Sequence, residues 1–106
     1  MSTNDTSVIV TNNEEAHRYE VKMDEQLAVL TYERRGNHII FLHTGVPEAL
    51  AGHGIASKLA SFALEEARSQ KLTVVPVCPF VADYIRHHQE YLSLLDPVEQ
   101  SRLLQS

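Results

Sequence analysis

The sequence predicts an α/β domain: a mixed sheet in which an antiparallel meander leads into a parallel pair of strands, flanked by helices. Three observations predict it. Polar and apolar residues alternate through the first half of the chain, a stripe of helical spacing lies between two apolar strands, and a glycine-bracketed turn leads into that helix. A strand that passes through a helix into a neighbouring strand is typical of a parallel crossover.

Three strands are expected in the first half of the chain. Residues Arg18–Met23 alternate in the manner of a half-buried strand, and Gln26–Arg34 repeat the pattern after a turn at Asp24–Glu25. A second turn, Gly36–Asn37, leads into His38–Val46, whose centre is apolar on both faces. This third strand is therefore predicted to be the most buried.

The N-terminal residues 1–13 are rich in Ser, Thr, Asn and Asp and have no sustained period. Such a segment is expected to be a mobile tail, with room for a short strand at Val8–Val10. Residues 14–106 are then expected to form a single domain.

The second half of the chain is predicted to alternate helix and strand. A helix over Gly54–Gln70 leads into a strand over Leu72–Cys78, in which Pro76 marks either an edge that lacks a partner or a bulge. A helix over Pro79–Leu95 follows, and the Asp-Pro-x-Glu pattern from Asp96 predicts a short terminal helix.

Composition narrows the class of protein. The chain has 106 residues, 43% of them hydrophobic, which is enough for one core and no second domain. Its net charge of −5 argues against nucleic acid as a partner and slightly favours a cationic or amine ligand. A single cysteine, a polar N-terminus and the absence of a long apolar run indicate a cytoplasmic protein that does not enter a membrane.

The most informative stretch runs from Thr44 to Ser57 and reads TGVPEALAGHGIAS. Gly52 and Gly54 let the backbone approach a ligand, and the helix that follows points free amides and its positive dipole end at that place. This predicts an anion site, with phosphate as the expected ligand. No Lys follows Gly54 as in a Walker loop, and the next strand carries no acidic residue as a dinucleotide fold requires. A tight turn without a ligand remains the alternative.

A resemblance to a known family favours the ligand site. The run VPEALAGHGIASKL that begins at Val46, the His43-Thr44 pair before it, and the VPVCPFV segment that begins at Val75 are together similar to the GNAT acetyltransferase superfamily. They resemble in particular its small, single-domain YjdJ-like N-acetyltransferases. The similarity spans residues 19–91. It implies a GNAT-like sheet whose parallel strands splay apart, with the pantetheine arm of acetyl-CoA in the gap.

The resemblance also implies which residues bind acetyl-CoA. Its pyrophosphate would lie on the amides around the glycines, and its thioester near the end of the strand, where a main-chain N–H stabilises the oxyanion. The expected donor-binding residues are Thr44, Val46, Ala51, Gly52, His53, Gly54, Ile55, Ala56 and Ser57.

Two catalytic residues are expected. Pro79 places Cys78 beside the N-cap of the last long helix, where the helix dipole stabilises a thiolate; the alternative is a small buried residue. His43 is the candidate base, because an imidazole titrates near neutrality. Direct transfer with His43 as base and transfer through an acetylated Cys78 both remain open.

The chain departs from the superfamily pattern in three places. Ala49 replaces the Arg or Gln that commonly supports the pyrophosphate, so either His53 compensates or the affinity is low. Pro79 and Arg86 replace the usual Asn and Tyr, so the common Tyr general acid is missing. Arg86 would then hold a thiolate or phosphate, or be a solvated surface residue. The six histidines show no metal-ligand spacing, so no metal is expected.

The sequence thus predicts an acetyl-CoA-dependent N-acetyltransferase that acts on a primary amine. The acceptor is either a small molecule or a protein Lys. The alternative is a CoA-binding or protein-interaction module without turnover. A monomer or a weak homodimer is expected.

Overall fold

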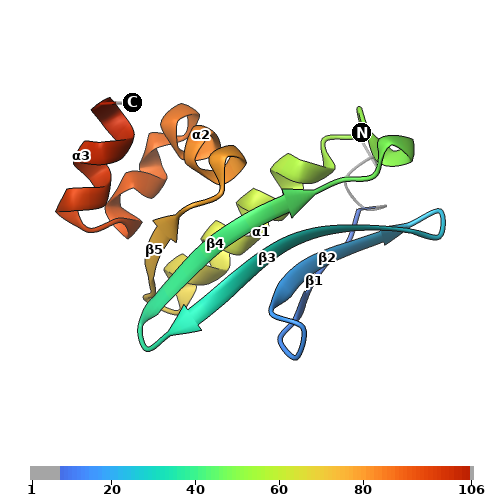
Figure 1. Cartoon of the computed structure of the whole chain (residues 1–106), viewed down its shortest axis with the longest axis horizontal. Coiled ribbons are helices and arrows are strands. Elements are labelled where there is room, and N and C mark those ends of the chain that lie inside the picture. The colour runs from blue at the N-terminus through green and yellow to red at the C-terminus, as the bar shows by residue number, and fades with distance from the viewer. Residues whose placement is uncertain (1–7, 106) are drawn as a thin grey trace.

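A five-stranded mixed sheet forms the centre of the computed structural model, which describes residues 8–105 (Figure 1). The strands lie side by side in sequence order. The first four pair antiparallel, and the last pair is parallel. This confirms the predicted fold class. The strands are β1 (Val10–Asn13), β2 (Arg18–Met23), β3 (Gln26–Arg35), β4 (His38–Gly45) and β5 (Thr73–Pro76).

Helices complete the second layer. The long helix α1 (Ile55–Ser69) connects β4 to β5 and lies behind β3 and β4 in Figure 1, while α2 (Pro79–His87) and α3 (Pro97–Gln105) lie beyond β5. Short 3-10 helices at Glu48–Leu50 and Gln89–Leu94 precede α1 and α3. The terminal helix is capped as expected, because the Glu99 amide donates to the Asp96 carboxylate at 2.9 Å.

The core lies between α1 and one face of the sheet. The predicted stripe of α1 is buried at Ile55, Leu59, Ala63 and Ala67. Phe62 stays 40% exposed and packs edge-on against Tyr19, with ring centroids 5.9 Å apart. The sheet contributes large residues that are at most 2% exposed, namely Tyr19, Val21, Leu30, Ile39, Phe41 and Val74.

The second face of the sheet is only partly covered. Along β3, Ala28, Leu30 and Tyr32 are buried while the alternating residues between them are half-exposed. Glu20 shares this outer face because it pairs with Val29, yet it is only 4% exposed. Its carboxylate accepts hydrogen bonds from Arg18 at 2.7 Å and Asn13 at 2.9 Å, and these hold the pKa of Glu20 below its ordinary value.

The first strand lies slightly later than the sequence suggested. A short strand was expected at Val8–Val10 within the N-terminal segment 1–13, and the structure has β1 at residues 10–13, paired with β2; residues 1–7 lie outside the described part. Side chains hold β1 in place: Asn12 donates to Glu66 of α1 at 3.0 Å and accepts from the Tyr32 hydroxyl at 2.7 Å. Polar residues that look like a tail in sequence are therefore ordered by partners distant in the chain.

The helix predicted over Pro79–Leu95 is broken, which corrects that expectation. It ends at His87, and His88 leaves the helical conformation with φ −138° and ψ 75°. The imidazoles of His87 and His88 bond the carbonyls of Asp83 and Tyr84, each at 2.9 Å. In a continued α-helix the His88 amide would donate to the Tyr84 carbonyl, but the His88 imidazole bonds that carbonyl and the amide donates to Ile85 at 3.1 Å; the apolar spacing continues in a 3-10 helix.

Candidate active site

The two parallel strands separate midway along β4. Pairing with β5 runs from His38 to Phe41, and its last contact is the Cys78 amide donating to the Phe41 carbonyl at 2.8 Å. Pro79 then begins α2, and the chain turns away. Within the described residues, the rest of β4 has no strand beside it on this edge. The opening between the end of β4 and the start of α2 is where Val46 and Phe80 line a common cavity.

A β-bulge in β4 accompanies this opening. Tyr32 pairs with Phe41 and Thr31 pairs with His43, which leaves Leu42 without a partner on β3. A bulge of this kind bends a strand and increases its twist. Beyond it, Thr44 pairs with the fully buried Leu30 and so shares the helix-covered face of the sheet.

Cys78 lies at the inner end of the opening. It is the N-cap residue of α2, as the sequence predicts, and is 2% exposed. Its sulfur lies 3.2 Å from the Thr44 hydroxyl oxygen, and either atom can be the donor. The Cys78 thiol therefore faces β4 on the side of the sheet that α1 covers.

His43 lies on the other side of the sheet. It pairs with Thr31 on the outer face, and its side chain is exposed. A Cβ built on Gly45 would lie 3.4 Å from His43 Nε2 and 3.8 Å from Val29, so the imidazole lies beside this glycine. The two predicted catalytic residues are thus both at the opening, but the structure places them on opposite faces and does not bring them into contact.

The turn before α1 has the backbone conformation that the glycines allow. Gly52 and Gly54 have φ values of 87° and 70°, which side chains rarely adopt. Gly54 is the N-cap and has no side chain to bond the first amides of the helix. The first helical hydrogen bond runs from the Lys58 amide to the Gly54 carbonyl at 3.1 Å. The amides of the three residues before Lys58 precede that bond, so they can serve an anion.

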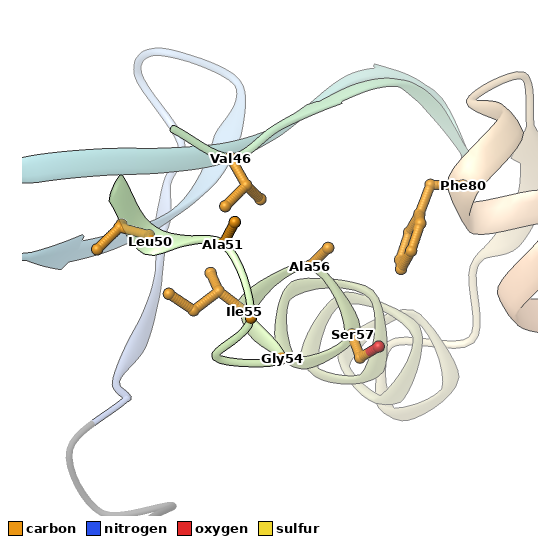
Figure 2. A pocket seen from close by; sticks show the side chains of 9 residues that line it. Val46, Leu50, Ala51, Gly54, Ile55, Ala56, Ser57 and Phe80 are labelled. Atoms are coloured by element: carbon orange, nitrogen blue, oxygen red, sulfur yellow. The ribbon is translucent and has the colours of Figure 1, made fainter. Parts of the chain in front are cut away.

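A cavity of about 280 Å³ lies against these amides. Its lining carries no charged side chain, so an anion there would be held by backbone N–H groups and the helix dipole. Figure 2 shows Val46 and Phe80 on two sides of the cavity, with the first turn of α1 below them. The lining residues are Val46, Leu50, Ala51, Gly52, Gly54, Ile55, Ala56, Ser57 and Phe80.

Most of the predicted donor-binding residues line this cavity. Thr44 and His53 do not: Thr44 lies further back, at Cys78, and His53 is exposed in the turn. Leu50 and Phe80 line the cavity but were missing from the predicted set. Phe80 could have been predicted, since it lies in the VPVCPFV segment. Leu50 lies in the cavity wall because it is part of the 3-10 helix Glu48–Leu50, which has no clear signal in the sequence.

Arg86, which replaces the usual Tyr of the superfamily, and Tyr84, two residues before it, both have partners outside the cavity. Arg86 donates through Nε to the Leu103 carbonyl at 3.0 Å and lies 3.6 Å from Asp83, so it joins α2 to α3. Tyr84 stacks on His88 with ring centroids 4.0 Å apart. Neither side chain lines the cavity.

Two features are absent from residues 8–105. No group of three or more His, Cys, Asp and Glu side chains is arranged to hold a metal ion there. Nor does that part of the chain contain a helix with the length and apolar character needed to cross a membrane.

Known proteins are similar to this chain in sequence and in fold. Residues 18–94 match the family of GCN5-related N-acetyltransferases. Protein NATD1 of Mus musculus is 38% identical over 73 residues, which cover 66% of each chain. Protein NATD1 of Xenopus tropicalis is 30% identical over 97 residues, which cover 87% of this chain and 89% of that protein.

A solved structure is similar over most of its length. It is the solution structure of a Staphylococcus aureus protein described as a GCN5-like protein of the N-acetyltransferase type. Its TM-score is 0.66 at 27% identity, and the match covers 85% of this chain and 89% of that one. Together with the family match over residues 18–94, this shows that the chain belongs to the GCN5-related N-acetyltransferase family and has its fold.

Proposed function

We propose that this protein transfers the acetyl group of acetyl-CoA to a primary amine. The observation that carries the proposal is the junction of two features: a cavity against the first amides of α1 and an opening between β4 and α2. The first suits a pyrophosphate, and the second suits an extended amide-bearing arm. A family whose members are N-acetyltransferases makes acetyl-CoA the donor to test first.

Donor binding is expected to depend on the backbone. The pyrophosphate would accept hydrogen bonds from the amides of Ile55, Ala56 and Ser57, with the dipole of the 15-residue helix α1 behind them. The pantetheine arm would pass between Val46 and Phe80 and bond the free edge of β4. Because the Arg or Gln of the superfamily is Ala49 here, we expect weaker binding than a basic side chain would allow.

Two routes for the transfer remain in the proposal. In the direct route, the amine enters from the outer face, His43 removes its proton, and the nitrogen attacks the thioester carbon as CoA leaves. In the covalent route, the Cys78 thiolate attacks the same carbon and CoA leaves as a thiolate that takes up a proton. The amine then attacks the acetyl-cysteine, loses its proton, and releases Cys78 as a thiolate.

Binding and turnover are tested separately. Calorimetry with CoA and acetyl-CoA measures binding, and release of free thiol after addition of an amine panel measures transfer. Binding followed by thiol release supports the proposal; binding without release identifies a CoA-binding module instead. Absence of binding at millimolar concentration contradicts both. Mass spectrometry after mixing with acetyl-CoA alone shows whether Cys78 becomes acetylated.

A matched pair of variants locates the donor site. Ser57→Glu places a carboxylate in the first turn of α1 beside the cavity, and Ser61→Glu places the same charge one turn further along. Glutamate near a helix N-terminus stabilises the helix, so Ser57→Glu should fold well. We expect it to weaken binding of CoA at least about tenfold by competing with the phosphates, while Ser61→Glu binds CoA as the parent does.

The acceptor is proposed only as a class. The half-exposed outer face of the sheet at His43 suits either a small amine or a Lys side chain on a protein. A monomer or weak homodimer and a cytoplasmic location belong to the same proposal, the latter supported by the single unbridged cysteine.

A further inference from the structure

One side-chain contact bridges β4 and the start of α2 beyond the point where the backbones separate. The last backbone contact is the Cys78 amide on the Phe41 carbonyl. Three residues further along β4, the Thr44 hydroxyl reaches back to the Cys78 sulfur at 3.2 Å. We propose that Thr44 is the positioning residue for the Cys78 thiol. The role of that thiol at the thioester rests on the function proposed above.

The Thr44 hydroxyl suits a sulfur that changes its protonation state. A hydroxyl both donates and accepts, so it can accept from the thiol and donate to the thiolate. Cys78 is 2% exposed, so water has little access to donate a hydrogen bond to the sulfur in place of the Thr44 hydroxyl. A thiolate formed here therefore depends on Thr44 and on the N-terminal amides of α2.

The strand holds Thr44 in the required place. Its backbone pairs with Leu30, which is fully buried, and the bulge at Leu42 turns its side chain to the helix-covered face. A β-branched side chain in a strand has few rotamers, so the hydroxyl direction is restricted. Replacement by Ser would keep the hydroxyl, and replacement by Val would keep the shape without it.

The contact lies at the closed end of the donor site. Val46 follows Thr44 by two residues and Phe80 follows Cys78 by two, and these two side chains lie on either side of the cavity (Figure 2). An arm that enters past Val46 and Phe80 would reach the hydroxyl and the sulfur next. The uncapped amides and the cavity thus mark where a donor enters, and the Thr44–Cys78 pair marks where it ends.

The test measures the thiol itself. Cys78 is the only cysteine in the chain, so the rate of reaction with 4,4′-dithiodipyridine at pH 7 reports on this sulfur alone. We expect Thr44→Val to lower the rate about three- to tenfold, because a thiolate loses a hydrogen bond while the nucleophilicity of the sulfur partly compensates. Thr44→Ser should keep the rate within about twofold.

The conservative variant separates positioning from packing. Equal rates in all three proteins, or equal losses in Thr44→Ser and Thr44→Val, would overturn the proposal. Circular dichroism checks the fold, and Thr44→Ala replaces Thr44→Val if the latter does not fold. The assay contains neither CoA nor amine, so its outcome is independent of whether the protein proves to be an acetyltransferase.

Discussion

The two halves of β4 serve different purposes. Residues 38–41 have a strand on each side and place Ile39 and Phe41 in the core, where each is at most 1% exposed. Residues 43–45 pair with β3 alone and Leu42 bulges out of the pairing; the side chains of Leu42, His43 and Thr44 are exposed or half-buried. β4 runs through both halves as one strand. The halves differ because β5 pairs with the first half and has left the sheet before the second.

This difference shows how the domain separates stability from chemistry. A strand paired on both sides has no backbone groups left for a ligand, whereas a strand with one free edge offers a row of donors and acceptors. The candidate site residues His43, Thr44 and Cys78 all lie at the half of β4 that has a free edge. We therefore expect substitutions in the paired half to affect unfolding and those in the free half to affect binding and transfer.

The largest expected effect is on the paired half. Phe41→Ala removes a fully buried ring and should lower the free energy of unfolding by about 3 to 5 kcal/mol, measured by urea denaturation. Leu42→Ala, one residue along but 42% exposed, is the matched control and should cost less than about 1 kcal/mol. Equal losses would show that the two halves do not differ in stability.

The next effect concerns the free half. Under the covalent route, Cys78→Ser should lower amine acetylation at least about a hundredfold, because an alcohol is a far weaker nucleophile than a thiolate, while the free energy of unfolding changes by less than about 1 kcal/mol. Full activity in this variant would eliminate the covalent route and leave His43 as the residue to change.

A smaller effect is expected at the turn that follows β4. Gly54→Ala should cost about 1 to 2 kcal/mol of stability, because a side chain must adopt φ 70°. Gly45→Ala meets only van der Waals contact with His43 and has no positive φ, so it should be nearly neutral. Thermal unfolding of both variants tests this, and a larger loss in Gly45→Ala would contradict it.

The smallest effect involves the outer face beside the free half, where Glu20, Val29 and Gly45 lie in one row. Hydrogen bonds from Arg18 and Asn13 keep the pKa of Glu20 below its ordinary 4.5, so the folded state favours the carboxylate. This stabilisation is present above pH 4.5 and is lost as the pH falls. Glu20→Gln should cost about 1 kcal/mol near pH 7, and this difference from the parent should shrink on acidification. Denaturation at pH 7 and pH 3 measures it; an equal difference at both values would contradict it.

Much of the fold could be predicted from local patterns. Alternation in β2 and β3, the apolar stripe of α1 and the Asp96 cap each depend on residues close in sequence, and the structure agrees with them. Two elements differ from the prediction. β1 is held by the distant residues Glu66 and Tyr32, which bond Asn12, and α2 ends early where the imidazoles of His87 and His88 bond carbonyls of the preceding turn.

The candidate site divides in the same way. The turn from Gly52 to Ser57 follows from glycines that permit positive φ before a helix, and the cavity lies there. The face of the sheet on which His43 and Cys78 lie could not be predicted from sequence. One bulged residue in β4 reverses which of the following side chains face the helix. The sequence placed both residues near the opening, and the register placed them on opposite sides of it.

The sequence by itself determined the order of the elements, the family and the glycine turn, since these depend on spacing and on the backbone freedom of single residues. Only the tertiary structure decided that β4 keeps a free edge after Phe41, that Thr44 contacts Cys78, and that Leu50 and Phe80 join the cavity. The physical reason is that these features depend on where one segment leaves another. The path of a partner strand is set by packing across the whole core, not by the residues at the point of divergence.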